Sequence, residues 1–285
     1  MRSHSFLSSL IVLSLNQIVA FTFLANSFHS PGGHLSFRTS LDLASEGDVD
    51  TKSVDIARAG PELPEIQPTA KRLFLVRHGE VINPGGRRPV YYGAMDVSLS
   101  PLGKDEAKAA AKYLQQFDLE HVISSPLSRA VFGAEQVISM QSNLQSDIIK
   151  IDGFKELDRG SWCGKTKDEI GLEMMARFDA CDESVTPEGG ESYPYLKQRV
   201  LDARDTVLDM VSAGRAAVIV SHLQVTRSML SDAMDVPTNE MANLSIATAS
   251  ITCIDYDTVT GSQNVHFQSF KPDSGLGKSK DLARD

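Results

Sequence analysis

The sequence has few of the residues that define several large protein classes. Its three cysteines, Cys163, Cys181 and Cys253, are odd in number and widely spaced, so they predict neither a disulfide framework nor a zinc site. The formal net charge of -9 lacks the basic excess that nucleic acids and anionic membranes select, so neither is expected as a partner. An anionic substrate stays compatible with this charge, because a few clustered arginines can reverse the local field.

A long uninterrupted hydrophobic run is also missing. The most apolar stretch, residues 6–23, contains serine, asparagine and glutamine and is too short and too polar to predict a stable membrane span. With Arg2 before it and the small residue Ala20 near its end, it fits a cleavable signal peptide that leads into the secretory route. The acid-free segment that follows resembles a transit peptide, so residues 1–41 together resemble the bipartite plastid presequences of algae with secondary plastids. A plain secretory signal and a disordered tail are the alternatives.

The rest of the chain divides by composition into three parts. Residues 42–70 are acidic and contain proline, which predicts a disordered linker without a packed core. Residues 71–271 have the length and apolar content of one compact domain, and they contain no internal repeat. Residues 272–285 are expected to form a flexible tail. The oligomeric state is left open by the sequence.

Apolar runs alternate with helical periodicity through this domain. Short runs predict strands, and Ser-Pro pairs at Ser100-Pro101 and Ser125-Pro126 predict helix starts, because serine caps a helix and proline suits its first position. The strands are expected at residues 73–76, 121–123, 148–151, 217–220, 250–256 and 264–270, and two further helices at about 193–212 and 225–234. This alternation predicts an α/β fold, a three-layer sandwich with a mostly parallel central sheet and helices on both faces.

Two of the predicted strands run directly into histidine. His78 follows the strand 73–76 with Arg77 before it, and His222 follows the strand 217–220. The carboxyl ends of parallel strands are where open α/β sheets bind ligands. A neutral imidazole can attack phosphorus, and the forked guanidinium of arginine suits phosphate oxygens. With Arg129 in the first turn of a helix, where anions are favoured, the pattern predicts a phosphate site with a histidine nucleophile.

Five blocks in order carry a family resemblance. They are Arg77-His78-Gly79-Glu80, Ser124 to Ala130, Glu156 with Gly160 to Gly164, Gly189 to Ser192, and Val220-Ser221-His222. Over about residues 71–256 the chain is similar to the histidine phosphatase superfamily, the phosphoglycerate mutase-like group. The resemblance implies the fold of that group and phosphoryl transfer on a small phosphorylated substrate. It implies no cofactor and no metal.

The resemblance also implies a role for each residue. His78 would be the nucleophile that becomes phosphorylated, and Arg77, Arg129 and His222 would hold the phosphoryl group. Glu156 would protonate the leaving oxygen and then deprotonate the attacking water.

Departures from the family pattern give further candidates for substrate binding. Leu223 stands where many members have glycine after the second histidine, and its backbone N–H is expected to reach the phosphoryl group. Asn83 is offset by one position from an asparagine of the family, and it too is expected to bind substrate. Arg87 and Arg88 lie in a glycine-rich loop and are predicted to bind a second anionic group, the alternative being a solvent-exposed loop.

Three functions remain open at this point. The first is a metal-independent phosphomonoester hydrolase. The second is a bisphosphate-dependent phosphoglycerate mutase, which the compact domain and the absence of the Arg-His-Tyr motif of mutases after Glu156 make less favoured. The third is a catalytically silent scaffold that binds a phosphorylated partner, and such a scaffold would need neither a nucleophile nor a proton donor.

Overall fold

The computed structural model describes residues 60–144 and 147–275, and the predicted leader lies outside them, as do most of the predicted linker and tail. A six-stranded sheet has the order β3-β2-β4-β1-β5-β6. Four strands are parallel: β1 (Ala70–Arg77), β2 (Leu119–Ser124), β3 (Ile149–Lys150) and β4 (Ala216–Ser221). The last two, β5 (Ile251–Asp257) and β6 (Gln263–Phe270), are antiparallel. The predicted mostly parallel sheet is confirmed.

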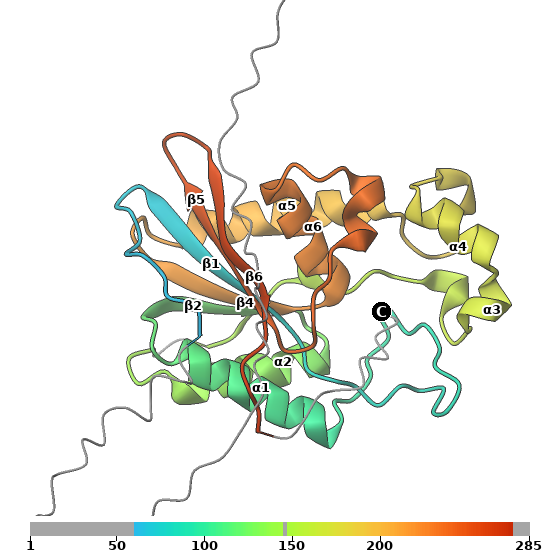
Figure 1. Ribbon diagram of the computed structural model, residues 1–285, viewed down its shortest axis with the longest axis horizontal. Coiled ribbons are helices and arrows are strands. Elements are labelled where there is room, and N and C mark those ends of the chain that lie inside the picture. The colour runs from blue at the N-terminus through green and yellow to red at the C-terminus, as the bar shows by residue number, and fades with distance from the viewer. Residues whose placement is uncertain (1–59, 145–146, 276–285) are drawn as a thin grey trace, which may run out of the picture. The chain divides into compact units, whose positions relative to one another are not determined.

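Helices cover both faces of this sheet, as Figure 1 shows. On one face lie α1 (Pro101–Leu114) and α2 (Ser128–Met140), and on the other α5 (Tyr193–Met210) and α6 (Leu223–Ala233). The alternation of side chains along β1 divides the core accordingly. Leu73 and Leu75 pack with the apolar residues of α5 and α6, whereas Phe74 and Val76 pack with those of α1 and α2. The three-layer sandwich expected from the sequence is therefore present.

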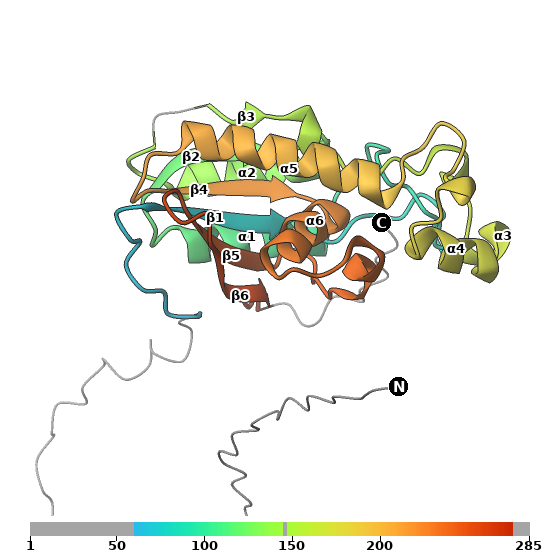
Figure 2. The same cartoon turned by 90° about the horizontal axis from the view of Figure 1, so that it is seen from above.

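Shorter elements lie between β3 and α5 and after α6. The 3-10 turns are η3 (Asp152–Phe154), η4 (Gly160–Trp162), η5 (Glu183–Val185) and η6 (Thr238–Asn243), and the short helices are α3 (Lys167–Ile170) and α4 (Leu172–Asp179). Figure 2 shows α3 and α4 beyond the carboxyl ends of β1 and β4. None of the helices in the described ranges is long and apolar enough to cross a membrane.

The folded part begins before residue 71, where the sequence placed its start. Leu63 and Ile66 pack against the core on the α1 side of the sheet. The Tyr113 hydroxyl donates to the Pro61 carbonyl at 3.1 Å, and Arg72 donates to the Pro64 carbonyl at 3.0 Å. Residues 60–69, near the end of the predicted linker, are thus ordered before β1 begins, held by a few apolar contacts and carbonyl hydrogen bonds that composition does not reveal.

The predicted helix starts are right at Ser100 and wrong at Ser125. The Ser100 hydroxyl accepts from the Gly103 N–H at 3.0 Å and caps α1, with Pro101 at the first position. Helix α2 instead begins at Ser128, whose N–H donates to the Asp96 carboxylate at 2.9 Å. The hydroxyl of Ser125 accepts from the Leu127 N–H at 3.3 Å, before the helix begins, and also contacts a site residue described below.

Candidate active site

The sheet brings the two histidines together. Strands β1 and β4 are parallel neighbours in which Arg77 stands opposite Ser221, so His78 and His222 leave the same edge. Their ring centroids are 5.1 Å apart, with the rings at 61° in an edge-to-face arrangement. Both side chains are buried. This edge is the carboxyl end of the parallel strands, where the sequence placed the site.

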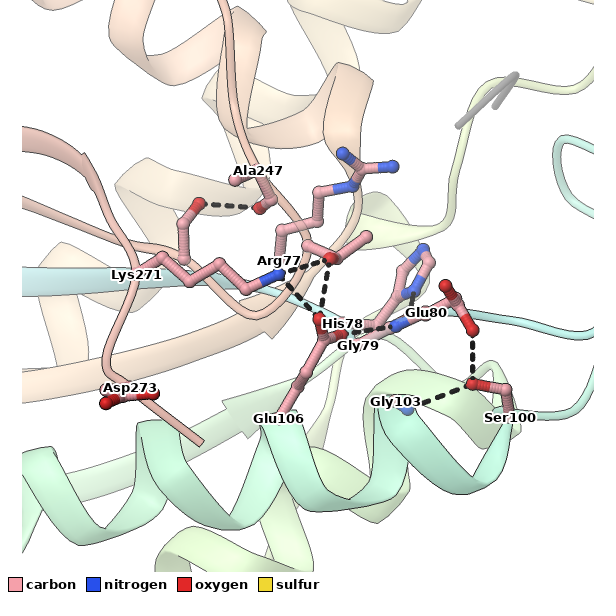
Figure 3. Close-up of polar contacts among 12 residues, drawn as sticks. Arg77, His78, Gly79, Glu80, Ser100, Gly103, Glu106, Ala247, Lys271 and Asp273 are labelled. Atoms are coloured by element: carbon pink, nitrogen blue, oxygen red, sulfur yellow. Dashed lines mark hydrogen bonds and ion pairs between the residues drawn. The ribbon is translucent and has the colours of Figure 1, made fainter. Parts of the chain in front are cut away.

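Backbone hydrogen bonds hold His78 from β4 on one side and from the turn that precedes β5 on the other. Its N–H donates to the Ser221 carbonyl at 2.9 Å, and its carbonyl accepts from the Ala249 N–H at 3.0 Å. In the ring, Nδ1 lies 2.7 Å from the Gly79 carbonyl (Figure 3). Because a carbonyl only accepts, Nδ1 carries the proton, and in the neutral ring the lone pair lies on Nε2. The side chain is thus fixed in the tautomer that leaves the lone pair on Nε2.

Two glycines allow α1 to approach the residues that follow His78. A Cβ on Gly79 would lie 2.1 Å from the Gly103 carbonyl oxygen, and one on Gly103 would lie 1.9 Å from the Glu80 carbonyl oxygen. These distances exclude any side chain at either position. The first turn of α1 therefore packs directly against the backbone beside His78.

His222 has a different environment. Its Nε2 lies 2.7 Å from the Ser125 hydroxyl, at the end of β2. Burial lowers the pKa of His222 well below its ordinary value, and the positive charge of Arg129 and the neighbouring His78 and Arg77 lower it further. A neutral ring carries one N–H. If Nε2 accepts from the Ser125 hydroxyl, Nδ1 carries the proton and has a hydrogen bond to give to a bound oxygen.

Arg77 and Arg129 are both buried and are held by carbonyl groups. One guanidinium nitrogen of Arg77 donates to the Ile246 carbonyl at 2.6 Å. Arg129 donates from its two terminal nitrogens to the Gly93 and Met95 carbonyls, each at 2.7 Å. These bonds fix the direction of both guanidinium groups, which are suited to binding an anion.

Glu156 is fully buried, and two backbone N–H groups hold its carboxylate. The Leu157 N–H donates to Oε1 at 2.7 Å, and the Gln224 N–H in the first turn of α6 donates to Oε2 at 3.3 Å. The helix that begins after His222 thus also binds the predicted proton donor. Glu156 and Gln224, which are 68 positions apart in the chain, meet through this one turn.

The segment that carries Glu156 is anchored by an arginine that the sequence did not point to. Arg199 on α5 donates to the Gly153, Lys155 and Glu156 carbonyls and pairs with Glu191 at 2.7 Å. Glu191 in turn accepts from the Asp158 N–H at 3.0 Å. Glu191 belongs to the fourth block of the family resemblance, so that block supports the position of the acid.

The four residues predicted to bind substrate have contacts that do not by themselves indicate a binding role. The Asn83 amide is taken up by its own loop, since it donates to the Val90 carbonyl and accepts from the N–H groups of Gly85 and Val90. Arg87 and Arg88 are exposed, and Arg88 lies 3.1 Å from Glu169 on α3. Leu223 is the first residue of α6 and packs its side chain on Leu230 and Ile246. Contact of these four with substrate stays a prediction.

Besides Arg199, sequence reasoning misses Ser125 and the Gln224 N–H at this site. The Ser125-Pro126 pair predicts a helix cap, although the place of Ser125 directly after a strand, like that of the histidines, is a signal for a site position. Gln224 acts through its backbone N–H, a contact that the residue type cannot predict. Within the described ranges, no group of three or more histidine, cysteine, aspartate or glutamate side chains is placed to hold a metal ion.

A mostly parallel sheet between two layers of helices, with two histidines and two buried arginines near its carboxyl edge, is an arrangement suited to binding phosphate. The family model of the histidine phosphatase superfamily, branch 1, matches residues 73–266, and the chain belongs to this superfamily. Among solved structures, YhfR of Bacillus stearothermophilus is similar with a TM-score of 0.62 and 26% sequence identity. The match covers 70% of this chain and 97% of that protein.

Curated relatives include both activities of the family. A Mycobacterium tuberculosis protein named as bifunctional is 31% identical over 227 residues, which cover 76% of this chain and 60% of that protein. Phosphoserine phosphatase 1 of Hydrogenobacter thermophilus is 34% identical over 162 residues, 55% of this chain and 74% of that enzyme. A 2,3-bisphosphoglycerate-dependent phosphoglycerate mutase of Cytophaga hutchinsonii is 27% identical over 182 residues, 62% of this chain and 84% of that enzyme. The chain thus spans about 60% of the length of the first of these relatives.

Proposed function

We propose that this protein hydrolyses phosphomonoesters through a phosphohistidine on His78, without a metal ion. The observation that carries the proposal is the tautomer of His78: the Gly79 carbonyl fixes the proton on Nδ1, and the nucleophilic Nε2 belongs to a ring 5.1 Å from that of His222. A scaffold that only bound phosphate would need the arginines but no oriented nucleophile.

In the first step, Nε2 of His78 attacks phosphorus and the bond from phosphorus to the ester oxygen breaks. The charge that develops on the phosphoryl oxygens is stabilised by Arg77 and Arg129, with a hydrogen bond from neutral His222. The carboxyl group of Glu156 gives its proton to the leaving oxygen, so the alcohol departs neutral.

In the second step, water attacks the phosphohistidine. The Glu156 carboxylate removes a proton from this water, and the bond from phosphorus to Nε2 breaks to release inorganic phosphate. Glu156 is then protonated and His78 neutral again, as at the start. The two N–H groups on Glu156 keep its oxygens in place through both proton transfers.

The test is turnover of the purified chain in the presence of a chelator. The substrates are p-nitrophenyl phosphate, a panel of phosphate esters, and 3-phosphoglycerate supplied with 2,3-bisphosphoglycerate. We expect the wild type to release phosphate. The His78→Ala variant should stay folded and release phosphate about three or more orders of magnitude more slowly. A folded His78→Ala variant that retained turnover would contradict the proposed nucleophile.

The second candidate is a phosphoglycerate mutase, which the mutase-named relative supports. Such an enzyme uses the same phosphohistidine but returns the phosphoryl group to its substrate instead of to water. Interconversion of 2- and 3-phosphoglycerate without phosphate release would select this function. The panel therefore distinguishes the two enzymes in one experiment.

We propose further that residues 1–41 direct the chain into the secretory route, with a plastid as destination. The support is the sequence of the leader alone, since these residues lie outside the described part of the chain. Fluorescent fusions of residues 1–41 and of the chain from residue 42 test this in an alga with secondary plastids. Secretion of the first fusion would favour a plain signal peptide.

A further inference from the structure

A buried carboxylate lies next to the nucleophile and has no part in the mechanism above. Glu106 on α1 accepts from the Glu80 N–H at 2.8 Å through Oε2. Through Oε1 it accepts from Lys271 at 2.5 Å and from the Thr248 hydroxyl at 3.3 Å (Figure 3). The Glu106 side chain is 2% exposed, and an isolated charge at such depth is strongly unfavourable. Lys271, 165 positions later in the chain, supplies the compensating charge.

Glu106 is connected to the His78 ring through a single peptide group. The Glu80 N–H and the Gly79 C=O belong to the same peptide unit. Its N–H donates to Glu106, and its oxygen accepts from Nδ1 of His78 at 2.7 Å. Hydrogen bonds in series polarise one another, so a carboxylate at one end strengthens the acceptor at the other.

Lys271 also reaches the opposite side of the nucleophile. Its ammonium donates to the Thr248 hydroxyl at 2.9 Å. The next residue, Ala249, donates its N–H to the His78 carbonyl and has a φ of 51°, in the left-handed region that non-glycine residues rarely adopt. A strained residue persists only where its surroundings hold it, and Lys271 anchors the adjoining residue. The Lys271 side chain thus connects Glu106, which binds the peptide after His78, with Thr248, which precedes the residue bonded to the His78 carbonyl.

We propose that Glu106 and Lys271 are positioning residues for phosphoryl transfer. Through the peptide between Gly79 and Glu80 they hold the imidazole of His78 in the Nδ1-protonated tautomer, with Nε2 directed to phosphorus. They act on the nucleophile through the backbone and not on the substrate. The inference rests on the nucleophilic role proposed for His78.

The experiment compares four variants of the full-length chain: Glu106→Ala, Glu106→Gln, Lys271→Met and Lys271→Arg. Glu106→Gln matches glutamate in shape and keeps an acceptor for the Glu80 N–H, so it tests the charge even if the alanine variant fails to fold. The matched control is Lys108→Met, which removes a half-exposed ion pair with Asp105 on the same helix. Each protein is assayed for thermal unfolding, steady-state kinetics and single-turnover phosphorylation by p-nitrophenyl phosphate.

We expect Glu106→Ala to slow phosphorylation of His78 by about tenfold or more while KM changes by less than about twofold, as for other residues that orient a catalytic group. Glu106→Gln and Lys271→Met should fall between this variant and the wild type, Lys271→Arg should restore most of the rate, and Lys108→Met should leave it unchanged. Variants that unfold at lower temperature yet phosphorylate His78 at the wild-type rate would overturn the inference.

A second measurement keeps the inference separate from the proposed function. Nitrogen-15 spectra of the histidine rings, assigned with His78→Ala, report the tautomer of His78 without any turnover. We expect the Nδ1-protonated form in the wild type and a mixture of tautomers in Glu106→Ala. A wild type that is never phosphorylated contradicts the proposed function, whereas an unchanged tautomer in Glu106→Ala contradicts only the role of Glu106.

Discussion

Two pairs of arginines near the carboxyl edge of the sheet differ in how the fold holds them. Arg77 and Arg129 are each 1% exposed, and backbone carbonyls fix their guanidinium groups. Arg87 and Arg88 stand exposed on the loop after β1, and the side chain of Arg88 is 69% exposed although it pairs with Glu169. The same chemical group is thus preorganised in one pair and solvated in the other.

The difference decides what each pair can contribute to phosphoryl transfer. A fixed charge in a medium of low dielectric stabilises developing negative charge strongly, and it needs no reorganisation during the reaction. An exposed charge is screened by water and salt, and ordering its long side chain costs entropy. The field of the buried pair is already visible in His222, whose pKa both arginines lower.

The largest expected effect comes from disturbing the buried pair. Arg129→Lys keeps the charge but cannot reach both the Gly93 and Met95 carbonyls and offer a fork to phosphate. We expect kcat/KM for p-nitrophenyl phosphate to fall by about two to three orders of magnitude, as when a preorganised donor of a transition-state oxyanion is lost.

Arg87→Lys is the matched control, because it makes the same exchange at an exposed site. We expect it to change kcat/KM by less than about twofold. Equal effects of the two substitutions would show that burial does not distinguish the pairs.

The comparison also shows how far the sequence can predict such a site. Strands β1 and β4 were readable because each is a short apolar run that ends in a polar residue, and parallel pairing then places His78 beside His222. The burial of Arg129 depends instead on carbonyls of residues 93 and 95, more than 30 positions earlier. Local pattern contains no such information.

The error at the start of α2 has the same origin. Ser125-Pro126 has the local chemistry of a helix cap, but the Ser125 hydroxyl is 2.7 Å from His222, which follows a different strand. Asp96, 32 positions before Ser128, accepts from the first N–H of the helix in its place. The pairing of Glu106 with Lys271 likewise cannot be predicted from the sequence, since only the folded sheet brings α1 and the end of β6 together.

An intermediate effect is expected from the charge state of His222. Burial first, and then Arg129, His78 and Arg77, lower its pKa below the ordinary value near 6.5, so the unfolded chain binds a proton that the folded chain does not. The contribution of neutral His222 to stability is present above pH 6.5 and is lost as the pH falls below it, by about 1.4 kcal/mol per pH unit.

Urea unfolding of the wild type and of His222→Gln between pH 7.5 and 5 measures this dependence. On acidification the unfolding free energy of the wild type should fall relative to that of the glutamine variant, because glutamine does not titrate. Parallel curves at all pH values would mean that His222 binds its proton as readily in the folded chain as in the unfolded chain, in spite of the two arginines beside it.

The smallest effect is expected from the exposed pair of arginines. Replacing both Arg87 and Arg88 by alanine should raise KM about two- to fivefold for a substrate with a second anionic group and leave kcat unchanged. The reason is that a screened charge contributes to binding in the ground state and the transition state alike. For p-nitrophenyl phosphate, which has no second anion, KM should stay the same.

High salt should reduce the difference between the wild type and the double variant, because the ionic atmosphere already screens exposed charges. An unchanged KM for every doubly anionic ester in the panel would remove this loop from the substrate site. The buried arginines would then be the only charged side chains of the two pairs with a role in recognition.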